Sequence, residues 1–193
     1  MSLLQYIFAV PVFAYIDESY DLAKGYYVLC ATLVDGTETE RIREQTRCLS
    51  IGSGKIHWHS EGPGRRRLLT DAVTAMDIAH IAVIGRAARR EERARRKCLE
   101  VLLPELDRCE VSSAVLESRQ RRKDKLDHAL VGACRSKRLI SQRLQVLFSP
   151  GAAEPLLWLP DIVGGAIHLA ETGYSEYVKL IGEKLRVVEI DAS

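Results

Sequence analysis

The pattern of apolar and polar residues first predicts a β-hairpin. Residues 12–16 are aromatic and β-branched, which is typical of a strand, and they end at Asp17-Glu18-Ser19. A polar turn that closes at Gly25 separates them from residues 26–34, which are almost wholly apolar. Such a run is typical of a strand that is buried on both faces. We therefore expect these two strands to lie at the centre of a sheet.

Beyond the hairpin, the pattern alternates between helical spacing and short β-branched runs. The expected helices cover residues 36–50, 65–76, 89–106, 120–138 and 156–170. The expected strands cover residues 55–59, 78–84, 110–116 and 142–148, with a final short pair in 177–190. This order predicts an α/β fold with a mixed central β-sheet flanked by helices. Without a repeat or linker, we expect a single domain over residues 1–193.

Composition narrows the classes of protein. Hydrophobic residues make up 47% of the chain, and the net charge is only +2 although 28% of residues are charged, so local charge placement matters more than the total. The five cysteines are odd in number and form no C-x-x-C pair, which indicates reduced thiols in a cytoplasmic protein rather than a disulfide framework or zinc site. The apolar residues 3–16 lack the basic start of a signal peptide, so we interpret them as part of the fold. No segment approaches the roughly 18 apolar residues of a membrane span.

Three carboxylates occupy positions that α/β active sites use. Asp17 ends the first predicted strand, Glu117 ends the strand 110–116, and Asp161 lies in the first turn of the helix 156–170. Active sites in open α/β sheets collect at the carboxyl ends of strands. Taken singly, each acid has an ordinary interpretation as a helix cap or a solvated strand end, and for Asp161 that interpretation is the stronger one. The conjunction of the three acids favours a shared site.

A shared carboxylate site predicts divalent metal ions. Hard cations take oxygen ligands, so Asp17, Glu117 and Asp161 would bind one or two Mg²⁺ or Mn²⁺ ions. Such ions can hold a phosphodiester, activate a water and stabilise the leaving oxygen. This chemistry requires no side-chain general base.

Histidines and basic residues give weaker signals. His57 and His59 would share a face if residues 55–59 formed a strand, but two ligands without a third favour an exposed pair over a metal site. Lys55 and His57 could instead approach a phosphate near the acids. Two basic runs, at residues 86–97 and 119–125, either track a nucleic-acid backbone or form solvated helix faces, and the sequence leaves both interpretations open.

Four motifs follow one another along nearly the whole chain. The two specific ones are Ala14-Tyr-Ile-Asp-Glu-Ser19 and Glu154-Pro-Leu-Leu-Trp-Leu-Pro-Asp-Ile-Val-Gly-Gly-Ala166. The looser ones are Lys55-Ile-His-Trp58 and Val115-Leu-Glu-Ser-Arg119 with the trailing acids Asp124 and Asp127. In this order they resemble domain-of-unknown-function family 3800.

The resemblance implies a ribonuclease H-like fold, in which a mixed sheet opens with antiparallel strands and a late helix carries an acid. It matches Asp17 with the acid of the first strand, Glu117 with the acid that ends a later strand, and Asp161 with the acid of the late helix. Many members have Asp at the position of Glu117. Many also have Ala-Asp in the helix where this chain has Pro160-Asp161, a mild departure because proline is tolerated in a first helical turn.

The sequence therefore predicts a metal-dependent nuclease that hydrolyses phosphodiester bonds of DNA or RNA. Glu18 and Asp127 would be auxiliary acids, although strand alternation points Glu18 away from Asp17 unless the chain already turns there. The expected phosphate contacts come from basic side chains, namely Lys55, His57, Arg119, Arg121 and Arg122. The alternative is a non-catalytic ribonuclease H-like module that binds nucleic acid or a protein partner, a second copy of the chain included.

Overall fold

The computed structural model describes residues 10–52 and 54–193, and within them six strands form one mixed sheet in the order β5-β4-β1-β2-β3-β6. The strands are β1 (Val12–Asp21), β2 (Tyr26–Asp35), β3 (Ala79–Arg86), β4 (Val111–Glu117), β5 (Gln145–Ser149) and β6 (Leu185–Asp191). β2 pairs antiparallel with both β1 and β3, whereas the other neighbouring strands pair parallel. The chain thus opens with an antiparallel hairpin at the centre of the sheet, as predicted.

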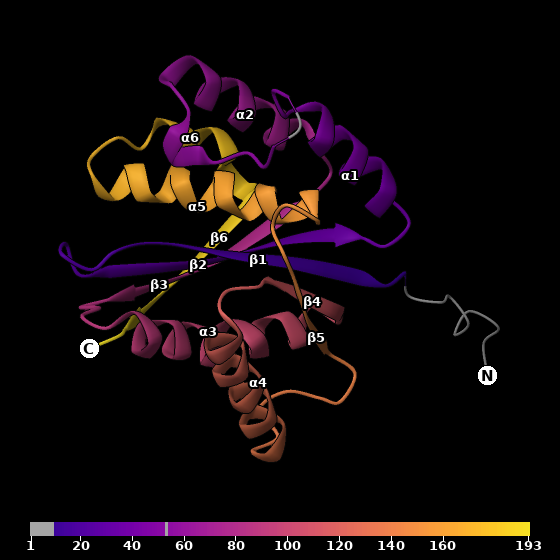
Figure 1. Ribbon diagram of the computed structural model, residues 1–193, viewed down its shortest axis with the longest axis vertical. Helices are drawn as coiled ribbons and strands as arrows, with labels where there is room; N and C mark the ends of the chain where they lie inside the picture. Colours follow the sequence, from indigo (N-terminus) through magenta and orange to yellow (C-terminus); the bar gives the residue numbers. More distant parts are fainter. Residues whose placement is uncertain (1–9, 53) are drawn as a thin grey trace.

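Helices cover both faces of the sheet (Figure 1). One face carries α1 (Thr39–Cys48), α2 (Pro63–Ala75), α5 (Trp158–Glu171) and α6 (Glu176–Ile181). The other face carries α3 (Glu91–Arg108) and α4 (Arg121–Ser136). Three short 3₁₀ turns span Trp58–Ser60, Pro155–Leu157 and Gly182–Lys184. Within the described part of the chain, no helix has the length and apolar character that crossing a membrane requires.

The central strands send alternate side chains into two hydrophobic cores. Tyr15 and Cys30 lie in the core beneath α5, whereas Ala14 and Ile16 lie in the core beneath α3. Because side chains alternate along a strand, the acids that follow Ile16 point to opposite faces. Asp17, which is paired with Cys30 in the register of β1 and β2, faces α5.

Two predicted strands are wrong. Residues 55–59 join no ladder; instead Trp58 opens a 3₁₀ turn and is buried in the core beneath α5. The final segment forms α6 before β6 rather than two strands. Tyr177 and Ile181 are spaced by one helical turn and are both buried, so the helix places them in the core together.

The first predicted strand was too short. β1 continues to Asp21 because the residues after Ile16 stay paired with β2, from Asp17 with Cys30 to Asp21 with Tyr26. Asp17 therefore lies within a strand rather than at its end. Part of the apolar stretch 3–16, residues 3–9, lies outside the described residues.

Candidate active site

Two of the predicted acids lie where β1 and β4 separate. The last registered pair between these parallel strands is Ile16 with Leu116, so Asp17 and Glu117 are the next residue on each strand. Ile16 and Leu116 both pack into the core beneath α3, and alternation then turns the next two side chains toward the α5 face. Sheet topology thus joins two acids that are far apart in the sequence.

Helix α5 brings the third acid to the same place. Asp161 lies in its first turn, and the Trp58 backbone N–H donates a hydrogen bond of 3.1 Å to Asp161 Oδ2. The helix lies against Ser19 of β1 at Gly164 and against the Trp58 ring at Gly165. A Cβ on Gly165 would lie 2.1 Å from the Trp58 ring, so the absence of a side chain permits this packing.

Replacement of the two neighbouring glycines of α5 by alanine should change the stability of the protein in opposite directions. Gly165→Ala would force the buried Trp58 ring to move, and we expect a loss of about 1–3 kcal/mol in unfolding free energy. Gly164→Ala is the matched control, since its Cβ would meet Ser19 at an ordinary 3.6 Å and alanine favours a helix interior. Urea unfolding of both variants checks this, and equal stability of the two would contradict the packing described.

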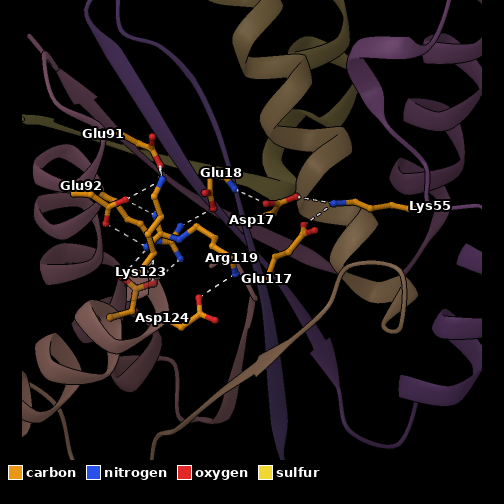
Figure 2. Close-up of polar contacts among 11 residues, drawn as sticks. Asp17, Glu18, Lys55, Glu91, Glu92, Glu117, Arg119, Lys123 and Asp124 are labelled. Carbon is orange, nitrogen blue, oxygen red and sulfur yellow. Dashed lines mark hydrogen bonds and ion pairs between the residues drawn. The ribbon is translucent and has the colours of Figure 1, made fainter. Parts of the chain in front are cut away.

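Lys55 lies between two of the acids, as Figure 2 shows. Its Nζ is 2.5 Å from Glu117 Oε2 and 3.6 Å from Asp17 Oδ2. Gly151 leaves room for this group, because a Cβ there would lie 2.2 Å from Glu117 Oε1 and 2.9 Å from Lys55 Nζ. The three acids and Lys55 line one cleft of about 290 Å³, whose other lining residues are Glu18, Ser118 and Arg119.

The electrostatics of the cleft show an excess of negative charge. Burial raises the pKa of the Asp17 carboxyl well above its usual value, and the charge of Glu18 adds to this effect. Glu117 and Asp161 raise the pKa of Asp17 further, whereas Lys55 lowers it. Burial also raises the pKa of Asp161. Burial alone would lower the pKa of Lys55, but the nearby acids, Asp17 first among them, outweigh burial and raise that pKa. One lysine therefore does not neutralise the acids around it.

The residues fit a hard divalent cation in donor type and in charge. Asp17, Glu117 and Asp161 offer only oxygen atoms, and a divalent ion would relieve their mutual repulsion. In residues 10–52 and 54–193, no three His, Cys, Asp or Glu side chains stand close enough together to hold a metal ion, and Lys55 instead bridges two of the acids. The donor atoms and the charge of the cleft therefore fit a divalent cation, whereas the described arrangement of the carboxylates does not by itself form a metal site.

The two predicted auxiliary acids do not join this group. Glu18 borders the cleft, but its carboxylate Oε2 is 2.5 Å from Arg95 Nη1. Asp127 is buried on α4, where its Oδ2 is 3.0 Å from Arg95 Nη2 and 3.2 Å from Arg119 Nη2. Both acids thus neutralise buried arginines on the α3 face, which is the ordinary role of buried carboxylates.

Of the residues predicted to contact phosphate, two line the cleft and three are exposed on the surface. Lys55 lies among the acids, and Arg119 lines the cleft while its guanidinium pairs with Glu92 at 2.7 Å (Figure 2). His57, Arg121 and Arg122 are exposed. The charge of His57 acts on Asp161 and lowers the pKa of that carboxyl against the larger effect of burial, whereas within the described residues no hydrogen bond or ion pair joins Arg121 or Arg122 to the cleft.

His57 and His59 are both exposed, which is the interpretation that the sequence favours. The strand that would have aligned His57 with His59 is absent from this part of the chain. The His59 ring instead packs edge-on against His168 of α5, with ring centroids 5.0 Å apart.

Sequence reasoning missed two elements of the site. Gly151 carries no local signal, because its role depends on a distant lysine and glutamate. Arg95 could have been found: it lies four residues before Leu99 and seven before Leu102, on the buried stripe of α3. A charge on an apolar stripe indicates a buried ion pair.

The chain matches no protein-family model and none of the curated protein sequences. Among solved structures, it is similar to ribonuclease HII in the PCNA:RNase HII complex from Archaeoglobus fulgidus, with 15% sequence identity and a TM-score of 0.54. The match covers 84% of this chain and 75% of that chain. The protein therefore has a ribonuclease H-like fold, which is the fold that the sequence resemblance implies.

Proposed function

We propose that this protein is a metal-dependent nuclease that hydrolyses phosphodiester bonds of nucleic acid. One observation carries the proposal: Asp17, Glu117 and Asp161 meet in a single cleft of a ribonuclease H-like fold. Fold similarity at this identity does not itself transfer an activity. The similar structure is that of a ribonuclease, which is consistent with the chemistry of the cleft.

Each group in the cleft has a role in this proposal. Bound Mg²⁺ or Mn²⁺ would supply Lewis acidity at the phosphate. It would also lower the pKa of a water, which makes that water a better nucleophile toward the phosphorus. Asp17, Glu117 and Asp161 would hold the cation, and Lys55 would place a fixed positive charge beside it. The exposed Arg121 and Arg122, in the first turn of α4, would contact phosphates farther along the strand, DNA or RNA.

A second candidate function is a non-catalytic module that binds nucleic acid or a protein partner. The position of Lys55 favours this candidate, because an ammonium between Asp17 and Glu117 already neutralises part of the acid cluster without a metal. Metal binding and cleavage separate the two functions.

We also propose that the chain belongs to domain-of-unknown-function family 3800. The support is that all four motifs of the resemblance contribute to one cleft, through Asp17, Lys55, Glu117 and Asp161.

We further propose that the protein is cytoplasmic. The five cysteines are free, which supports this location.

Cleavage should depend on a divalent cation. We expect the purified protein to cut end-labelled single- or double-stranded DNA or RNA in Mg²⁺ or Mn²⁺, to lose the activity in EDTA and to regain it when Mn²⁺ is restored in excess. Gel analysis of the labelled products measures this. Cleavage that persists in EDTA would contradict the proposal, and binding of these oligonucleotides without cleavage under every condition would support the non-catalytic module.

A further inference from the structure

The charged side chains that line the cleft carry more negative than positive formal charge. Three carboxylates face it from the α5 side, those of Asp17, Glu117 and Asp161. The two remaining charged groups that border it are engaged on the α3 side, Glu18 with Arg95 and Arg119 with acids of α3 and α4. In formal charge, the three carboxylates of the cleft therefore exceed the one ammonium of Lys55.

Lys55 occupies the position of a bridging cation. Its Nζ contacts one oxygen of Asp17 and one of Glu117. The distance between these two oxygens therefore cannot exceed the sum of their distances to Nζ. Its side chain is only 12% exposed, and the backbone at Gly151 closes over its ion pair with Glu117. The lysine is thus built into the cleft rather than reaching over it from solvent.

We propose that Lys55 replaces one of the two cations of a two-metal site, so that the cleft binds a single divalent ion. The inference rests on the proposed function and specifies its metal content. One divalent ion and one ammonium together balance three carboxylates. Two divalent ions about 3.5–4 Å apart would repel each other four times as strongly as two single charges at that distance. Together with Lys55 they would bring more positive charge into the cleft than three carboxylates balance.

The metal count of the intact protein tests this inference without an activity assay. Titration calorimetry with Mn²⁺ should give one ion per chain, and the electron paramagnetic resonance spectrum should be that of an isolated Mn²⁺. Lys55→Met removes the charge but keeps the chain length, and it should bind two ions per chain with a spin-coupled spectrum. Lys55→Arg keeps the charge and should again bind one ion.

Control variants locate the ion and guard against misfolding. Asp17→Asn should weaken Mn²⁺ binding at least about tenfold, as expected when a metal-site carboxylate is lost, whereas Asp71→Asn, an exposed acid on α2, should leave it unchanged. Lys55→Gln is a second neutral variant in case Lys55→Met does not give the circular dichroism spectrum of the parent protein.

The outcomes separate this inference from the proposed nuclease function. Two Mn²⁺ ions in the unmodified protein, or one in both folded neutral variants, would overturn the role of Lys55 and leave the nuclease proposal standing. One ion in the unmodified protein, two in the neutral variants and no cleavage of any nucleic acid would support the role of Lys55 and contradict the nuclease. No ion in any of these proteins would overturn both.

Discussion

Asp17→Asn is expected to slow cleavage severely while it makes the fold more stable. Asp17 contributes one of the three carboxylates of the cleft, and removal of a single preorganised electrostatic group from an active site lowers the rate by roughly 10²–10³-fold. Asparagine keeps the shape of the side chain and a carbonyl oxygen for the Glu18 N–H, which now donates to Asp17 Oδ1 at 2.8 Å. The loss should therefore come from the missing charge rather than from misfolding.

The gain in stability follows from the pKa of Asp17. Burial raises this pKa in the folded state, so the folded protein holds the proton more tightly than the unfolded chain does. Stability from this group is present at acidic pH and is lost as the pH rises from the unfolded pKa through the folded one. At neutral pH, asparagine removes that cost, and we expect a gain of roughly 1 kcal/mol that disappears under acidic conditions. Urea unfolding at neutral and acidic pH measures the difference.

Two further variants complete this test. Asp161→Asn should lose activity to a similar extent, while its amide oxygen still accepts the Trp58 N–H. The exposed Asp71 pairs with Arg67 on α2, so Asp71→Asn should cleave at the parent rate. Cleavage at the parent rate by Asp17→Asn would show that the acid cluster is not catalytic.

The largest loss of stability is expected from Arg95→Met. The Arg95 side chain is 1% exposed and pairs with both Glu18 and Asp127, so methionine would leave buried carboxylates without their shared cation. Breaking a buried ion pair from one side costs about 3–5 kcal/mol. Asp127 retains Arg119 at 3.2 Å, whereas Glu18 keeps no other ion pair among the described residues. The midpoint of urea unfolding measures the loss.

The adjacent arginine of α3 is a matched control. Arg96 is 66% exposed and pairs with Glu100 on the same helix, so Arg96→Met should change the unfolding free energy by less than about 1 kcal/mol. Adding Glu18→Gln to Arg95→Met should recover part of the loss, because it removes the carboxylate that is left unpaired. A double variant no more stable than Arg95→Met would assign the loss to packing rather than to charge.

The central hairpin could be predicted because its signal is local. The apolar run of β2 and the polar turn before it are enough to predict two adjacent strands. The end of β1 could not be predicted in this way, because Asp17 and Ser19 interrupt the apolar pattern while the ladder with β2 continues. The strand is held there by its neighbour rather than by its own composition.

The site was predictable in its acids but not in its surroundings. Asp17, Glu117 and Asp161 stand beside predicted elements, so topology alone suggests that they meet. The place of Lys55 depends on a segment that is neither the predicted strand nor a helix, and no periodicity indicates where such a segment runs. The density of arginines likewise does not distinguish a buried residue such as Arg95 from exposed ones such as Arg121 and Arg122.

The three acids of the cleft come from β1, β4 and α5, so the ribosome adds them to the chain at widely separated times. Asp17 emerges from the ribosome early, Glu117 after more than half of the chain, and Asp161 only with α5. Because long-range contacts form only after both partners are available, the cleft stays incomplete on a nascent chain until Asp161 has been added. The proposed nuclease site would therefore not form until α5 had been translated.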